Sequence, residues 1–126
     1  MSAGRKILIV DDEPGITNLV RSILTGEGFQ VSQANSWDEV TAHLESDRFS
    51  LVILDLMMPG VSGWDLYRKI RDHERHKETP VIILSARIKE KEIQDALQVR
   101  KVQDYITKPF SVQDLVSRVS KVLEAN

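Results

Sequence analysis

Three short stretches of the chain are apolar runs. They cover 6–10 (KILIV), 51–54 (LVIL) and 81–84 (VIIL). Runs of this kind are typical of strands covered on both faces, as in a parallel sheet between two layers of helices. Two further stretches, 29–34 (FQVSQA) and 102–107 (VQDYIT), alternate polar and apolar residues. Alternation is typical of edge strands, so the pattern predicts three central strands and two edge strands.

Between the predicted strands, the apolar residues follow the spacing of a helix. In the first such segment they recur at intervals of three and four from Ile16 to Leu24, which places them on one face. Pro14 suits the first turn of this helix, and Gly26 or Gly28 suits its end. The other helices are predicted from the capping box Ser36/Glu39 onward, over 63–73, over 88–100 and from the cap Ser111 onward.

The alternation of strand and helix predicts an α/β fold of five strand–helix units. Right-handed crossovers between parallel strands would give an open five-stranded parallel sheet with helices on both faces. With 29–34 and 102–107 as the edges, the favoured strand order is 2-1-3-4-5, the flavodoxin-like arrangement. Sites of such sheets lie beyond the carboxyl ends of the strands. We expect one domain over 1–126, with the polar stretch 71–80 as a loop or frayed helix end rather than a domain boundary.

Composition narrows the classes of function. The net charge of −2 provides no general attraction to nucleic acid or to an anionic membrane. The sequence has no cysteine, which excludes disulfides and thiolate metal sites and fits a cytoplasmic location. No apolar run is long enough to cross a bilayer, and the first residues lack a secretory pattern, so membrane insertion is not expected.

Chemically complementary residues follow four of the predicted strands. Asp11 and Asp12 follow the first strand, Asp55 the third, Ser85 the fourth and Lys108 the fifth. Each residue alone would more often be a helix cap, a solvent-exposed group or a satisfied hydroxyl. Together at one rim, the carboxylates suit a hard cation such as Mg²⁺, and the ammonium and hydroxyl suit phosphoryl oxygens. A carboxylate can itself accept a phosphoryl group as an acyl phosphate.

Four motifs, in this order and at this spacing, resemble the receiver domain of bacterial two-component response regulators. The resemblance covers essentially the whole chain. The motifs are ILIVDDEP (7–14), LVILDLMMPGVSGWDL (51–66), TPVIILSA (79–86) and DYITKPF (104–110).

The resemblance implies a role for each acidic residue at the rim. Asp55 is similar to the family's phosphoacceptor. Asp12 would bind Mg²⁺ directly, with Asp11 helping, often through water, and Mn²⁺ is the alternative ion. Asp55 and the backbone carbonyl of Met57 would complete the protein ligands.

The resemblance also implies a switch. Ser85 is similar to the hydroxyl that moves to the phosphoryl group, and Lys108 to the cation that pairs with it. Tyr105 is similar to the aromatic residue that changes rotamer when this hydroxyl moves. The bond before Pro109 is expected to be cis. The face built from the fourth helix, fifth strand and fifth helix would then change its partner preference.

The implied partners follow from the family. A histidine kinase or a phosphotransfer protein would donate the phosphoryl group, and the same face would allow a homodimer. Direct nucleic-acid binding is not expected, and no enzymatic turnover of a separate substrate is expected beyond the chain's own phosphoryl transfer and slow autodephosphorylation. The signal, the cognate kinase and the output are not readable from these residues.

Some residues depart from the family pattern or favour other interpretations. The segment 100–103 (RKVQ) stands where the family commonly has Gly-Ala, apparently with one extra residue. Arg87 lies near the predicted site and is a candidate for tuning the phosphoryl lifetime. Polar neighbours predict a solvated surface position for the three histidines, His43, His73 and His76.

Three other classes of protein remain as alternatives. A phosphohydrolase with an aspartyl-phosphate intermediate would need an acid two residues after Asp55, where this chain has Met57. A flavodoxin would need a phosphate-cradling loop where this chain has the acidic DDEPG. A receiver that has lost phosphorylation would not be expected to keep all the rim residues.

Overall fold

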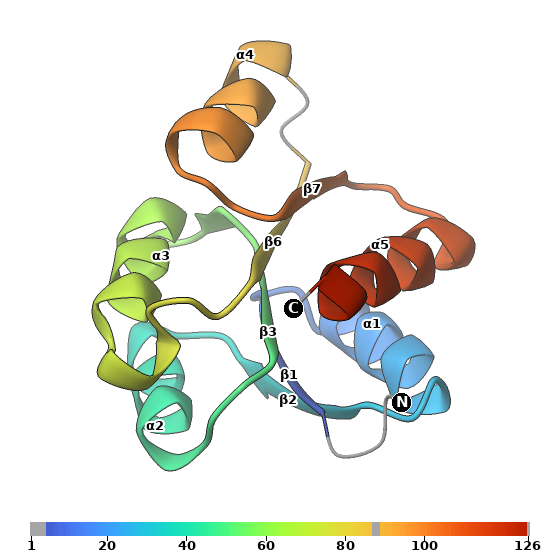
Figure 1. The fold of residues 1–126 in the computed structure, drawn as a ribbon, viewed down its shortest axis with the longest axis horizontal. Helices are drawn as coiled ribbons and strands as arrows, with labels where there is room; N and C mark the ends of the chain where they lie inside the picture. The colour runs from blue at the N-terminus through green and yellow to red at the C-terminus, as the bar shows by residue number, and fades with distance from the viewer. Residues whose placement is uncertain (1–4, 87–88, 126) are drawn as a thin grey trace.

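The computed structural model describes residues 5–86 and 89–125 of the chain. Its centre is a five-stranded parallel sheet with the order β2-β1-β3-β6-β7 (Figure 1). This is the predicted flavodoxin-like arrangement. The two alternating stretches form the edge strands β2 and β7, and the three apolar runs form the central strands. The strands are β1 (Lys6–Val10), β2 (Gln30–Ala34), β3 (Leu51–Leu54), β6 (Val81–Ser85) and β7 (Asp104–Thr107).

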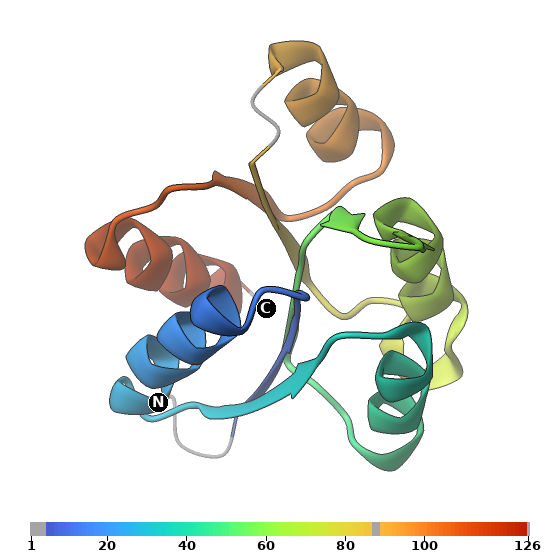
Figure 2. The ribbon, with the colours of Figure 1, turned by 180° about the vertical axis from the view of Figure 1, so that it is seen from behind.

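Helices cover both faces of this sheet. Helices α1 and α5 lie together on one face, and α2 and α3 lie on the other, as the front and back views show (Figures 1 and 2). The helices are α1 (Pro14–Gly26), α2 (Trp37–Ser46), α3 (Gly63–Asp72), the 3₁₀ turn η1 (Glu74–His76), α4 (Glu90–Gln94), the π-helical η2 (Asp95–Val99) and α5 (Val112–Ala125). In the part of the chain that is described, no helix is both long and apolar enough to cross a membrane.

Two apolar cores lie on opposite sides of the sheet. Along β1, Leu8 and Val10 face the core under α2 and α3, while Ile7 and Ile9 face the core under α1 and α5. Successive side chains of a strand point to opposite faces, so a strand buried on both faces must be apolar at consecutive positions. Burial on both faces therefore explains the apolar runs in the sequence.

Side-chain caps begin two helices, α2 and α5, where the sequence predicts them. Ser36 Oγ accepts a hydrogen bond from the backbone N–H of Glu39 (3.2 Å), and Ser111 Oγ accepts one from Asp114 (3.0 Å). The carboxylate of Glu39 reaches back to the N–H of Asn35 (2.8 Å), one residue before the cap itself. The two serine contacts satisfy backbone donors that the first turn of a helix leaves without partners.

The segment between the third strand and the third helix contains an unpredicted hairpin. Residues Met57–Met58 form β4 and pair antiparallel with β5 (Val61–Ser62). Gly60 lies at the turn with a positive φ of 72°, the left-handed region that glycine adopts readily. Each of these strands has only two residues, which is too short for an alternation pattern to be recognised. The sequence therefore predicts only a turn here.

The predicted helix over 88–100 begins at Glu90 and changes its winding at Asp95. The N–H of Arg100 donates to the carbonyl of Asp95 (3.0 Å), five residues earlier, which is the π-helical pattern. Lys101 follows with a φ of 63°. The wider turn and this left-handed residue accommodate the unusual segment 100–103, and Val102 then turns into the core.

The last predicted strand is shorter than its alternating pattern indicates. It begins at Asp104 rather than at 102. The N–H of Val102 donates to the carbonyl of Ala96 (3.1 Å) and so closes the preceding helix instead of joining the sheet ladder.

The prediction that the histidines are solvated surface residues is wrong for His76. Its side chain is 0% exposed, whereas His43 and His73 are half-buried. The 3₁₀ turn after α3 folds His76 inward, where its Nε2 accepts a hydrogen bond from the N–H of Phe49 (3.3 Å). Burial is possible here because the ring finds a polar partner.

Candidate functional site

The carboxyl ends of β1 and β3 bring two aspartates side by side. In the ladder Val10 is level with Leu54, so the residues that follow them, Asp11 and Asp55, leave the sheet together. The backbone N–H of Asp55 donates to the carbonyl of Val10 (2.9 Å), which extends the pairing by one step. Both aspartates are therefore positioned directly by the ends of two central strands.

Three carboxylates gather at this rim. Asp11, Asp12 and Asp55 each offer an oxygen, and these three oxygens lie within 4.8 Å of one another. Asp11 is 1% exposed and Asp55 3% exposed, while Asp12 is half-buried. Closely spaced oxygen ligands without histidine or cysteine are the donor set of a hard divalent cation such as Mg²⁺. The residues present therefore fit such an ion.

Backbone donors hold two of the carboxylates in place. One oxygen of Asp55, Oδ1, accepts from the N–H of Met57 (2.9 Å), and Asp11 Oδ1 accepts from the N–H of Glu13 (3.0 Å). The second oxygen, Oδ2, of each aspartate faces the same ammonium group. This arrangement leaves Asp55 with a defined orientation and one oxygen directed into the site.

That ammonium belongs to Lys108, which follows β7. Its Nζ donates to Asp11 Oδ2 (2.9 Å), Asp55 Oδ2 (3.0 Å) and Glu13 Oε1 (2.8 Å). The Lys108 side chain is 11% exposed. The peptide bond between Lys108 and Pro109 is cis, as predicted.

The site's electrostatics keep the lysine charged. Burial alone would lower the pKa of Lys108, but its bonds to Glu13, Asp11 and Asp55 outweigh burial and raise that pKa above its usual value. Burial raises the pKa of Asp55, and repulsion from Asp11 adds to the rise. The Met57 N–H and the Lys108 ammonium act in the opposite direction and lower it.

Ser85 and Tyr105 lie on the neighbouring strands β6 and β7. Ser85 is fully buried at the end of β6, level with Thr107 of β7, and its carbonyl accepts from the N–H of Lys108 (2.9 Å). Tyr105 is 5% exposed and belongs to the core on the α2 and α3 face. The structure thus places Ser85 beside the lysine backbone and Tyr105 in a buried position, and the switching roles of both stay predictions.

Met57 contacts the acid–lysine cluster through its backbone, since its N–H donates to Asp55. The side chain of Met57 is 49% exposed, and the prediction concerns only its backbone carbonyl. Its role as a ligand stays a prediction. Arg87, the candidate for tuning the phosphoryl lifetime, lies outside the described residues.

Sequence reasoning missed Glu13, the third acceptor of Lys108. The residue lies within the motif ILIVDDEP, directly before the proline that opens α1. Its position between the end of β1 and the start of α1 could have indicated a role in the site, because a side chain there can reach the carboxyl ends of the strands. The contact itself depends on the approach of a residue 95 positions away in the chain.

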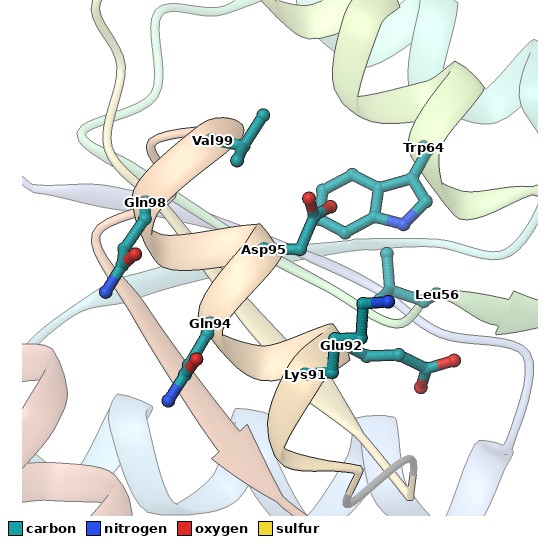
Figure 3. Close-up of a pocket in the computed structure, with 8 residues that line it drawn as sticks. All are labelled: Leu56, Trp64, Lys91, Glu92, Gln94, Asp95, Gln98 and Val99. Atoms are coloured by element: carbon teal, nitrogen blue, oxygen red, sulfur yellow. The ribbon is translucent and has the colours of Figure 1, made fainter.

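A groove of about 400 Å³ lies beside the site, between the start of α3 and the pair α4 and η2 (Figure 3). Its floor includes Leu56, the residue after Asp55, and Asp95 points toward the indole of Trp64. The Arg100 guanidinium lies 4.3 Å from the centre of the Trp64 ring. The contact of Arg100 with Trp64 links the residue after η2 to the start of α3.

The fold and this rim define a class of signalling domain, and comparison with known proteins identifies the family. A sequence model described as the response regulator receiver domain matches residues 7–120. The chain therefore belongs to the receiver domain family of two-component response regulators.

Curated relatives include longer regulators. The chain is 39% identical over 118 residues to the phosphate regulon transcriptional regulatory protein PhoB of Rhizobium meliloti, covering 94% of this chain and 52% of that protein. It is also 39% identical to the transcriptional regulatory protein ResD of Bacillus subtilis, covering 94% of this chain and 48% of ResD. The chain thus spans about half the length of the curated relatives it matches.

Solved structures agree with this assignment. NtrX of Brucella abortus is 32% identical with a TM-score of 0.88, covering 99% of this chain and 27% of that one. The chemotaxis protein CheY4 of Vibrio cholerae is 27% identical with a TM-score of 0.87, covering 95% and 99%. TrrA of Thermotoga maritima, solved in complex with Mg²⁺-BeF, is 32% identical with a TM-score of 0.78, covering 94% and 98%.

Proposed function

We propose that this receiver domain accepts a phosphoryl group on Asp55 in a Mg²⁺-dependent reaction and thereby changes its signalling face. The donor would be a histidine kinase or a phosphotransfer protein. The observation that carries the proposal is the contact of Lys108 Nζ with the buried Asp55 Oδ2 at 3.0 Å, inside a cluster of three aspartates. A buried carboxylate, a cation and oxygens suited to a metal thus lie together, which supports the proposal.

Asp55 is arranged to act as the nucleophile. The N–H of Met57 holds Oδ1, so Oδ2 is the oxygen turned into the site. In the transfer, a carboxylate oxygen of Asp55 forms a bond to phosphorus while the bond from phosphorus to the donor's imidazole nitrogen breaks. The donor histidine keeps the electron pair of the broken bond, and Asp55 becomes an acyl phosphate.

The cationic groups of the site would stabilise the transferred charge. Asp11, Asp12, Asp55 and the carbonyl of Met57 would hold Mg²⁺, with Mn²⁺ as the alternative. Bound there, the ion would offset charge on the phosphoryl oxygens. Lys108 supplies a second positive charge, which its acidic partners keep protonated in spite of burial. Positioning and charge stabilisation provide most of the catalysis in phosphoryl transfer.

The response would pass from Ser85 to the face built from α4, β7 and α5. The Ser85 hydroxyl would move to the phosphoryl group. Tyr105 would then change rotamer; it lies on β7, two residues before Thr107, which is level with Ser85. A new dianionic group thereby biases a two-state element. Partner binding or homodimer formation at that face would be the consequence. Direct nucleic-acid contact by this domain is not part of the proposal.

No enzymatic turnover of a separate substrate is included in the proposed function. A phosphohydrolase would need a general acid near Asp55, and the position two residues later carries Met57, whose side chain is 49% exposed. The acyl phosphate would therefore persist until slow autodephosphorylation or transfer removes it. A cytoplasmic location, where the proposed donors act, belongs to the same proposal.

Phosphorylation by a small donor tests the proposal. The protein is incubated with Mg²⁺ and acetyl phosphate, and intact mass is measured before and after treatment with base. We expect one acid-stable, base-labile phosphoryl group on the wild type and none on Asp55→Asn. Asp65→Asn is the matched control, because Asp65 is an exposed acid at the start of α3. No uptake by the wild type, or equal labelling of Asp55→Asn, would overturn the proposal.

A further inference from the structure

The three acceptors of Lys108 differ in their freedom to move. A lysine ammonium has three N–H donors, and all are used here by Asp11, Asp55 and Glu13. The side chains of Asp11 and Asp55 are 1% and 3% exposed, whereas that of Glu13 is 58% exposed. The two aspartates are further held by backbone N–H groups.

The backbone of Glu13 is anchored, whereas its carboxylate is bonded to Lys108 and is largely exposed. Its N–H donates to Asp11 Oδ1 (3.0 Å), and its carbonyl accepts from the N–H groups of Ile16 and Thr17 (3.0 Å each). The residue is the N-cap of α1, but its side chain forms no capping bond. Rotation of the carboxylate into solvent would therefore leave the start of α1 unchanged.

We propose that Glu13 is a positioning residue that occupies one donor of Lys108 in the resting site and competes with the incoming phosphoryl group for it. This inference rests on the proposed phosphorylation of Asp55. A phosphoryl oxygen beside Asp55 needs an N–H of Lys108, and all three are already used. Glu13 is the most solvent-exposed of the three partners, so its contact with Lys108 is the one that breaks when the phosphoryl group arrives.

A purely structural role for Glu13 makes a different prediction. A negative charge near the first turn of a helix is favourable, so replacing Glu13 could simply weaken α1. That effect would lower the free energy of unfolding without altering the affinity for a phosphoryl mimic. A general field effect would depend on the charge at position 13 and not on the reach of the side chain.

Beryllium fluoride is a suitable mimic because it binds without a covalent step. Its dissociation constant is measured by calorimetry at saturating Mg²⁺, which removes any change in affinity for the metal itself. Glu13→Gln keeps the shape of the side chain and removes its charge. Glu13→Asp keeps the charge and shortens the reach by one methylene. Asp38→Asn is the control, since it removes one charge from the exposed first turn of α2.

We expect Glu13→Gln to bind beryllium fluoride about two- to five-fold more tightly, the range for one partly exposed ion contact. Glu13→Asp should shift in the same direction, Asp38→Asn should match the wild type, and the acyl phosphate of Glu13→Gln should survive longer. An unchanged or weaker affinity of Glu13→Gln, or a wild-type affinity of Glu13→Asp, would overturn the inference.

The same preparations separate this inference from the proposed function. If the wild type takes up a phosphoryl group from acetyl phosphate but Glu13→Gln binds the mimic as the wild type does, only the role of Glu13 fails. If the wild type takes up no phosphoryl group, the proposed function fails and the inference fails with it.

Discussion

Acid should destabilise this protein through His76, a buried histidine far from the acidic rim. Nε2 of His76 accepts from the N–H of Phe49 (3.3 Å), and its Nδ1 lies 3.3 Å from Nδ1 of His73. Nδ1 of His73 also accepts from the N–H of Arg75 (3.3 Å). The neutral tautomer with its proton on Nδ1 satisfies all of these contacts. A second proton on Nε2 would face the N–H of Phe49, donor against donor.

The magnitude follows from the pKa of His76. Burial lowers this pKa from 6.5 to about 4, and the nearby charges of His73, Arg75 and Arg48 contribute in the same direction. Between these values the unfolded chain binds more protons than the folded one, so stability rises with pH. The contribution is complete above pH 6.5 and is lost as pH falls toward 4. A pKa shift of this size corresponds to a loss of about 3 kcal/mol in the free energy of unfolding over this pH interval.

The substitution His76→Gln isolates this effect. The Gln Oε1 takes the place of Nε2 as acceptor for the N–H of Phe49 and does not titrate. At pH 7 the variant should be less stable by about 1–2 kcal/mol, because the contact with His73 is lost. Its stability should then fall less than that of the wild type on acidification, by about 3 kcal/mol over the full interval.

Urea denaturation at several pH values between 4 and 7 measures the difference. His43→Gln serves as the matched control, because it makes the same replacement at a half-buried histidine. Titratable groups that do not contact the replaced histidine contribute alike to the proteins and cancel in the comparison. Parallel stability curves for the wild type and His76→Gln would refute the reasoning.

Three further substitutions test packing and backbone geometry by urea denaturation. Gly63→Ala should destabilise by about 1–3 kcal/mol, because a Cβ would lie 2.4 Å from the Cα of Leu56; an unchanged midpoint would contradict this close approach. Lys101→Gly should stabilise by about 1 kcal/mol, since Lys101 has a φ of 63°; destabilisation would argue against the left-handed turn. Tyr67→Phe should cost about 1 kcal/mol, because its hydroxyl donates to the carbonyl of Arg100 (2.5 Å); no loss would show that this bond does not stabilise the fold.

Much of the fold follows from local sequence patterns. The strands β1, β3 and β6 were predictable because a strand covered on both faces is apolar at successive positions. Ser36 and Ser111 marked helix starts because capping depends on residues three positions apart. Carboxyl ends of parallel strands share one rim, so the strand order brought Asp11, Asp55 and Lys108 together in prediction as well as in structure.

Other features were decided by tertiary structure. The sequence by itself indicated which acids and which lysine share the rim, but not that Glu13 is bound to Lys108 across 95 positions of the chain. Polar neighbours likewise predicted an exposed His76, whereas its burial depends on Phe49, 27 positions earlier. Periodicity and capping reflect interactions among residues close in the chain. The partner of a long side chain is decided only when distant segments pack against each other. Packing sets the distance from that side chain to each possible partner, and it also sets how far water is excluded.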